Sequence, residues 1–236
     1  MKNLILFVSL FSILLISSCT KDERLGTGVF LTEERENNNF DGVEVTGSLE
    51  VHLIQSNQFR VKVESYENLL PYVETFVSNG VLQIRMSRGF ENSGREAIVW
   101  VYAPNVYEIN LNGSGYVVTD NYHNFKNYLE ANLQGSGDIT VRGTAREANV
   151  SLTGSGVIRM EGSGSHLNID NSGSGVVRAY GYRVDEAKVR IFGSGNAEID
   201  VWLYLDAEIV GSGDIIYQGN PRVQAFKSGS GLIRRR

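Results

Sequence analysis

The chain has 236 residues, and its 27 acidic side chains outnumber the 22 basic ones, which gives a net charge of −5. An acidic chain of this kind is not expected to bind nucleic acid. It has 26 glycines, three prolines and a single cysteine, so no intramolecular disulfide is available and the fold must rely on its own core.

The first 18 residues are typical of a secretory signal peptide. Lys2 precedes an apolar run from Leu4 to Ile16, which is too short to span a bilayer comfortably. The run ends in Ile16-Ser17-Ser18-Cys19, which resembles the lipobox of bacterial lipoproteins, where the cysteine is lipidated and becomes the mature N-terminus. We therefore expect residues 1–18 to be removed and Cys19 to carry the acyl chains that hold the protein on a membrane.

Residues 19–39 are predicted to be a flexible tether, because they carry many charges and a run of three asparagines. Lys21, Asp22 and Glu23 follow the cysteine closely and resemble the export signal of some Gram-negative lipoproteins. In those proteins the signal directs the lipoprotein to the outer face of the outer membrane. This predicts display on the cell surface, with the periplasmic leaflet as the alternative.

Residues 40–236 are predicted to form one all-β domain. From residue 40 to 110, short alternating runs such as Val43-Glu44-Val45 and Leu82-Gln83-Ile84 predict the opening coils of a larger array. The segment from Glu67 to Glu74 interrupts these runs, and it predicts one short helix that covers the first coil.

Seven Gly-Ser-Gly triplets then stand in register, at intervals of 18 to 22 residues, and such a period is typical of solenoids and arrays of hairpins. Apolar residues recur two and four residues before the first glycine of each triplet and four and six residues after that glycine, which predicts two half-buried strands flanking each triplet. The triplets begin at Gly113, Gly135, Gly154, Gly173, Gly193, Gly211 and Gly229.

Each triplet is most simply a corner, in which the glycines avoid a Cβ that would clash and permit positive φ, while the serine faces outward. A second corner is predicted eight residues after the first glycine of a triplet, at Gly143, Gly162, Gly181 and Gly219. Alternation alone does not separate a parallel β-helix from stacked hairpins. The recurrent second corner and the near-constant coil length favour the β-helix.

Two residues interrupt the apolar column that stands two residues before the triplets. Asn171 takes an inward position and therefore needs a buried hydrogen-bond partner. Lys227 takes the equivalent position in the last coil, where we expect the core to be open.

The chain resembles a family described as "putative auto-transporter adhesin, head GIN domain", a domain of unknown function. The resemblance covers about residues 38 to 220. It is carried by the triplets and by three further motifs: Phe40-Asp41-Gly42-Val43-Glu44-Val45, Glu67-Asn68-Leu69-Leu70-Pro71 and Asn79-Gly80-Val81-Leu82-Gln83-Ile84. It implies a right-handed parallel β-helix like that of pectin lyases, without their catalytic residues, and a role in adhesion. It supplies no functional residues.

The sequence contains no convergent set of acids for catalysis, and its three histidines occupy unrelated positions, so neither an enzyme, a metal site nor a cofactor is expected. An aromatic platform for a glycan or a protein is predicted around the second corner, because its members come from two adjacent coils: Tyr180, Tyr182, Trp202 and Tyr204. The predicted function is that of a lipid-anchored surface module for adhesion. A self-associating envelope protein, and thus a homo-oligomer, is one alternative, and a carbohydrate-active enzyme is the other.

Overall fold

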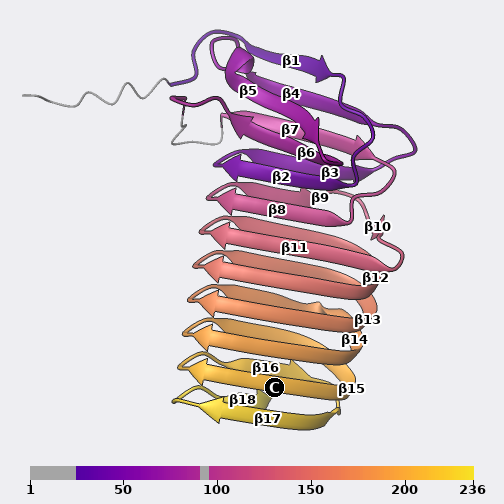
Figure 1. Cartoon of the computed structure of the whole chain (residues 1–236), viewed down its shortest axis with the longest axis vertical. Coiled ribbons are helices and arrows are strands. Elements are labelled where there is room, and N and C mark those ends of the chain that lie inside the picture. Colours follow the sequence, from indigo (N-terminus) through magenta and orange to yellow (C-terminus); the bar gives the residue numbers. More distant parts are fainter. Residues whose placement is uncertain (1–24, 91–95) are drawn as a thin grey trace, which may run out of the picture.

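The structure, a computed structural model of the chain, describes residues 25–90 and 96–236 (Figure 1). The predicted signal peptide, Cys19, Lys21, Asp22 and Glu23 lie outside these residues. In the described part, the only helix is the three-residue 3-10 turn η1 (Leu70–Tyr72), and no helix is long and apolar enough to cross a membrane.

Strands make up most of the described chain, and they fall into 18 elements. They are β1 (Phe30–Arg35), β2 (Gly42–Gly47), β3 (Glu50–Gln55), β4 (Arg60–Tyr66), β5 (Val73–Ser78), β6 (Val81–Met86), β7 (Ala97–Ala103), β8 (Glu108–Gly113), β9 (Tyr116–Thr119), β10 (His123–Asn124), β11 (Tyr128–Gly135), β12 (Asp138–Gly154), β13 (Val157–Gly173), β14 (Val176–Gly193), β15 (Asn196–Gly211), β16 (Ile215–Gln218), β17 (Arg222–Ser228) and β18 (Ile233–Arg235).

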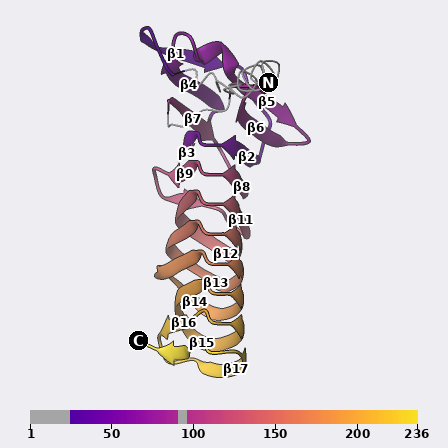
Figure 2. The same cartoon turned by 90° about the vertical axis from the view of Figure 1, so that its left-hand side faces the viewer.

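The coils stack along the long axis as a β-solenoid of about seven turns, which confirms the predicted fold class (Figure 2). Strand segments that precede the triplets form one sheet, here called the leading sheet, and segments that follow them form the trailing sheet. All pairings from β8 and β9 to β18 are parallel. The register keeps the first glycines opposite one another, as in Gly135, Gly154 and Gly173. Parallel pairing excludes stacked hairpins for these coils.

Each triplet is a corner held by hydrogen bonds between coils. The carbonyl oxygen of Gly135 accepts two bonds from the next triplet, from the backbone nitrogen of Ser155 at 2.9 Å and of Gly156 at 3.1 Å. A Cβ on Gly154, whose φ is +122°, would overlap that same carbonyl. The serine is exposed and the second glycine is buried. The corner therefore needs glycine because the backbones of successive coils approach closely.

Strands β12 to β15 run without a break from the trailing sheet to the leading sheet round the second corner. Only two of the four glycines predicted there have positive φ, Gly162 and Gly219. The register between β14 and β15 shifts twice at this corner, between Ala179 and Arg183 and between Val184 and Glu186. The variation in coil length is thus absorbed as bulges on this one edge.

The N-terminal coils do not stack in chain order. The coil of β2 and β3 lies between that of β6 and β7 and that of β8 and β9, all in parallel pairing. Beyond them the pairing becomes antiparallel, since β5 pairs with β6, and β4 pairs with both β7 and β1. These antiparallel strands, at the indigo and magenta end of Figure 1, cover the first coils. The short helix predicted over residues 67–74 is reduced to η1, where Pro71 follows the buried Leu70.

Part of the predicted tether is ordered strand, which corrects the boundary of 19–39. β1 pairs along its whole length with β4, from Phe30 opposite Tyr66 to Arg35 opposite Val61. Further along, the buried Asn37 accepts a 2.9 Å bond from the Thr75 hydroxyl. The charges of this segment suggested a solvated spacer, but its outward side chains tolerate an edge strand as well.

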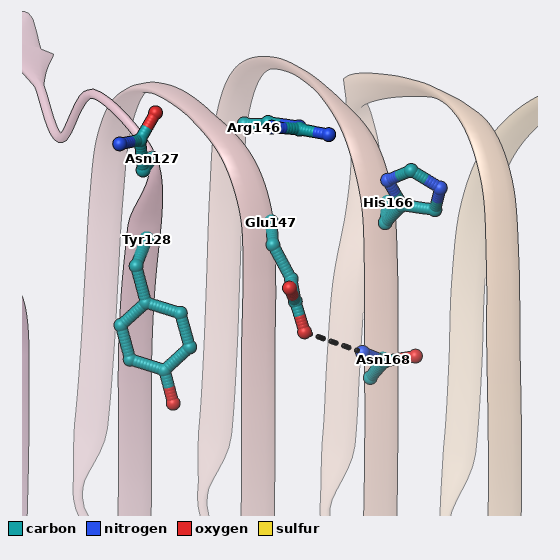
Figure 3. Close-up of a pocket in the computed structure, with 6 residues that line it drawn as sticks. All are labelled: Asn127, Tyr128, Arg146, Glu147, His166 and Asn168. Atoms are coloured by element: carbon teal, nitrogen blue, oxygen red, sulfur yellow. Dashed lines mark hydrogen bonds between the residues drawn. The ribbon is translucent and has the colours of Figure 1, made fainter.

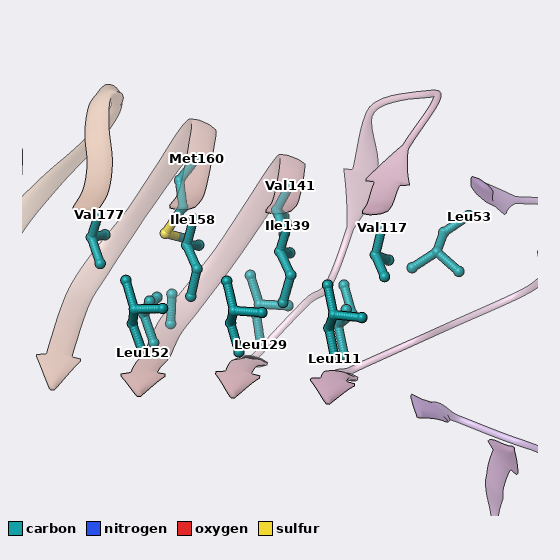
Figure 4. Packing of buried hydrophobic residues seen from close by; sticks show 14 of the residues in the cluster. Leu53, Leu111, Val117, Leu129, Ile139, Val141, Leu152, Ile158, Met160 and Val177 are labelled. Atoms are coloured by element: carbon teal, nitrogen blue, oxygen red, sulfur yellow. The ribbon is translucent and has the colours of Figure 1, made fainter. Parts of the chain in front are cut away.

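The core is a set of apolar ladders between the two sheets (Figure 4). The inward columns are buried in every coil from β8 to β15, with Leu152 and Ile158 fully buried. Asn171 is buried as expected and its amide nitrogen donates to the carbonyl of Gly175 at 2.9 Å. In the last coil every residue of β17 is exposed, including Lys227, so the core is open there as predicted.

Candidate binding groove

The predicted aromatic platform does not form, because Tyr182 points into the protein. Its side chain is fully buried, and its hydroxyl accepts a 3.2 Å bond from the backbone nitrogen of Ala145, two coils away. Gly164 leaves room for it, since a Cβ there would lie 2.8 Å from the hydroxyl oxygen. Burial raises the pKa of Tyr182 to about 12. Tyr182 is therefore a structural residue, and its place in the predicted binding site is wrong.

Tyr182 and Trp202 are also not neighbours across the strands. Tyr180, Gly181 and Tyr182 fall in a bulge of β14 where no residue of β15 is paired. Trp202 lies within the next register shift, with 42% of its surface exposed and the Arg183 guanidinium 4.1 Å above its ring. Their equal offsets from the triplets predicted that Tyr182 and Trp202 are neighbours. The prediction fails because the bulge displaces β14 against β15.

Of the four aromatic residues, Tyr204 lines a groove on the leading sheet, beside the second corner. Two hollows lie on either side of His166 and Asn168, which line both, and together they are here called the corner groove. The larger hollow has a volume of about 570 Å³. The groove is lined by Asn127, Tyr128, Arg146, Glu147, His166, Asn168, Glu186, Ala187, Lys188, Tyr204 and Asp206.

One column of outward residues runs through the corner groove from coil to coil. The register places Tyr128 opposite Glu147, Glu147 opposite His166, His166 opposite Glu186, and Glu186 opposite Tyr204. A ring and a carboxylate thus alternate over five successive strands, all at least partly exposed. Every member stands seven residues before the first glycine of its triplet. Reading the outward columns at that offset would have found this pattern, which the sequence reasoning missed.

Hydrogen bonds hold the side chains of the groove in place (Figure 3). The Tyr128 hydroxyl donates to Glu130 at 2.7 Å, and this bond raises the pKa of the phenol. The Asn168 amide donates to Asn149 at 2.7 Å and to Glu147 at 3.4 Å. Figure 3 shows Glu147 leaning from its own strand toward Asn168 on the next.

The corner groove carries charges of both signs. His166 lies 3.4 Å from Glu186, and the two side chains are about half exposed. Arg146 and Lys188 stand among the carboxylates of Glu147, Glu186 and Asp206. Carboxylates, amides and a phenol are suited to hydrogen-bonding hydroxyl groups. Among residues 25–90 and 96–236, no group of three or more His, Cys, Asp or Glu side chains is placed to hold a metal ion.

Fold and groove together define a β-solenoid with an exposed polar groove on its leading sheet. The family model of the putative auto-transporter adhesin, head GIN domain, matches residues 39–221, so the chain belongs to that family. No curated protein matches the chain.

Three solved structures share the fold. A putative lipid binding protein from Parabacteroides distasonis has a TM-score of 0.73 and 27% identity, covering 89% of this chain and 98% of its own. A putative adhesin from Bacteroides fragilis has a TM-score of 0.84 and 19% identity, with the same coverage. A putative adhesin from Parabacteroides merdae has a TM-score of 0.64 and 22% identity, covering 89% of this chain and 97% of its own. Family and neighbours carry the names of adhesins or binding proteins, which supports an adhesion-type module of the cell surface or envelope.

Proposed function

We propose that the chain is a lipid-anchored protein of the outer membrane that binds a partner at the cell surface through its corner groove. The observation that carries the proposal is the alternation of ring and carboxylate over five coils in one register. In this proposal the lipobox ending in Cys19 supplies the lipid anchor, and Lys21, Asp22 and Glu23 supply the signal for export to the cell surface.

A glycan suits the corner groove better than a protein. Sugar rings present apolar faces that stack on aromatic side chains and hydroxyl groups that bond to carboxylates and amides. Tyr128 and Tyr204 offer the rings, while Glu147, Asn168 and Asp206 offer the hydrogen-bonding groups. A protein interface would be expected to have a more apolar centre with fewer charges.

The test uses the lipidated full chain, purified in detergent, on an array of bacterial and host glycans. We expect binding to selected glycans that is lost in the double variant Tyr128→Ala, Tyr204→Ala and kept in Trp202→Ala, an exposed aromatic outside the groove. Binding that survives in the groove variant, or no binding to any glycan, would overturn the proposal. Release of reducing or unsaturated ends during incubation would instead support the carbohydrate-active alternative.

A second candidate function, self-association in the envelope, is favoured by β17. Its partner among the described strands is β15, on one side, and all seven of its residues are exposed. Phe226 is 59% exposed on this strand, and an exposed edge of this kind is a template for pairing with another chain. Sedimentation of the purified full chain at rising concentration tests this: growth in mass that Phe226→Lys abolishes would support it, and a constant monomer mass would contradict it.

A further inference from the structure

We infer that the corner groove holds an extended β-linked polysaccharide whose chain runs along the solenoid axis, across the strands. The inference rests on the proposed glycan function and adds the class of glycan, its direction and its length.

The direction follows from the column that the register sets. Tyr128, His166 and Tyr204 belong to β11, β13 and β15, and Glu147 and Glu186 belong to the two strands between them. A ligand lying along one strand would meet only one of these residues. A ligand lying across the strands meets all five, since they stand opposite one another in register and line the two hollows of the groove.

The spacing selects an extended chain. Neighbouring strands lie about 4.8 Å apart, so the rings recur about every 10 Å and a carboxylate lies halfway between them. Two β-linked pyranoses have nearly this length, and in an extended β-1,4-linked chain alternate sugars present the same face. Each ring of the column would therefore stack on every second sugar, and each carboxylate would accept hydrogen bonds from the hydroxyl groups of the sugar between.

A second column of polar residues flanks the first. Two positions further along the strands, Asn149, Asn168, Lys188 and Asp206 form a second, parallel column in the same register. Their amide, ammonium and carboxylate groups supply both donors and acceptors, which match sugar hydroxyls. Because Tyr128 and Tyr204 are separated by four strand spacings, or about 19 Å, the column has room for about five sugars.

The experiment measures affinity against chain length. The lipidated full chain in detergent is titrated with oligosaccharides of two to eight units from two β-linked series: β-1,4-glucose and β-1,4-N-acetylglucosamine. An α-1,4-glucose series of the same lengths, which coils rather than extends, is the control. In at least one β-linked series we expect affinity to rise up to about five units and then to level off, with no binding of the α-linked series.

Variants locate the chain. Tyr128→Ala and Tyr204→Ala remove the two ends of the column, so each should weaken binding of the longest oligosaccharide by roughly three- to tenfold and leave binding of the shortest oligosaccharides less affected. Trp202→Ala should bind like the parent. Circular dichroism melts check that each variant folds.

The outcomes separate this inference from the proposed function. Binding that is complete with one or two sugars, or equal for the α-linked series, would keep a glycan site in the groove and overturn the extended chain. Binding of none of the three series, with attachment to a different glycan on the array, would overturn the inference and leave the proposed function standing. Binding that the groove variants do not change would overturn both.

Discussion

At the scale of single residues, Tyr182 and Trp202 differ in burial although both are aromatic and both flank the second corner. Replacing Tyr182 with alanine empties a buried site and leaves the Ala145 nitrogen without its partner, so we expect a loss of about 3–5 kcal/mol in the free energy of unfolding. Trp202→Ala removes a partly exposed ring, its contact with Arg183 and the 2.7 Å bond from its indole nitrogen to the Asp200 carboxylate, and should cost about 1–2 kcal/mol. Urea denaturation of the two variants measures both values, and equal losses would contradict the assignment of Tyr182 to the core.

His123 predicts a dependence of stability on pH. Its side chain is 2% exposed, stacks on Phe125 and lies 3.2 Å from the backbone nitrogen of Gln55, and burial lowers its pKa below the usual 6.5. Below about pH 6.5 the unfolded chain therefore takes up a proton more readily than the folded one, so stability falls as the pH drops from there toward the folded pKa, by up to about 1.4 kcal/mol per pH unit.

Thermal melts of the parent at pH 7.5, 6.5 and 5.5 should show this fall in melting temperature. His123→Gln should flatten the dependence over that range even where it lowers stability at every pH. His166→Gln, at an exposed position in the corner groove, should retain the parent's slope. A parent whose melting temperature is constant over this range would refute the role given to His123.

At the scale of the strand, Leu152 and Ser155 test which residues point inward. Leu152 is fully buried beside Asn171, so Leu152→Asp loses roughly 1.5–3 kcal/mol of apolar burial and adds the cost of desolvating a carboxylate. Ser155→Asp lies on the exposed tip of the triplet and should change stability by less than about 0.5 kcal/mol. Denaturant midpoints compare the two, and a similar shift in both would mean that the coil is rotated from the described arrangement.

Strict repetition explains which elements the sequence predicts well. The triplets mark the corner of each coil and so locate the inward columns. In each coil a Cβ at the corner would overlap a carbonyl of the neighbouring coil, so glycine is required there each time. The same columns predict that Asn171 points inward and that Lys227 lies where the core is open. The order of the first coils is not predictable in this way, since the coil of β2 and β3 is inserted between later ones by pairings that no local pattern reveals.

The candidate site is less predictable than the fold. Offsets counted forward from a triplet fail beyond the second corner, because Tyr180 to Tyr182 of β14 have no partner in β15 and the register shifts again after Val184. Offsets counted backward stay in register up to the groove, as Tyr128, His166 and Tyr204 show. Edge strand β1 was missed because its charges resemble those of a spacer.

For the whole molecule, the proposed anchor gives a two-part prediction. Cys19→Ala should abolish lipidation, so the protein leaves the detergent phase in which lipoproteins partition. Replacing Lys21, Asp22 and Glu23 with alanine should preserve lipidation and abolish digestion by protease added to intact cells. A Cys19→Ala protein that stays in the detergent phase would contradict the lipid anchor, and unchanged digestion of the triple variant would contradict the export signal.

The paired hydrogen bonds at the triplets also bear on how the molecule responds to force. Because bonds such as those from Ser155 and Gly156 to Gly135 point from coil to coil, tension along the axis loads the coils in series, and the weakest coil opens first. A polymer seated across five coils would carry the same tension in parallel with those bonds. Under shear, the bound polymer would then resist separation of these five coils and make the solenoid stiffer than it is without ligand.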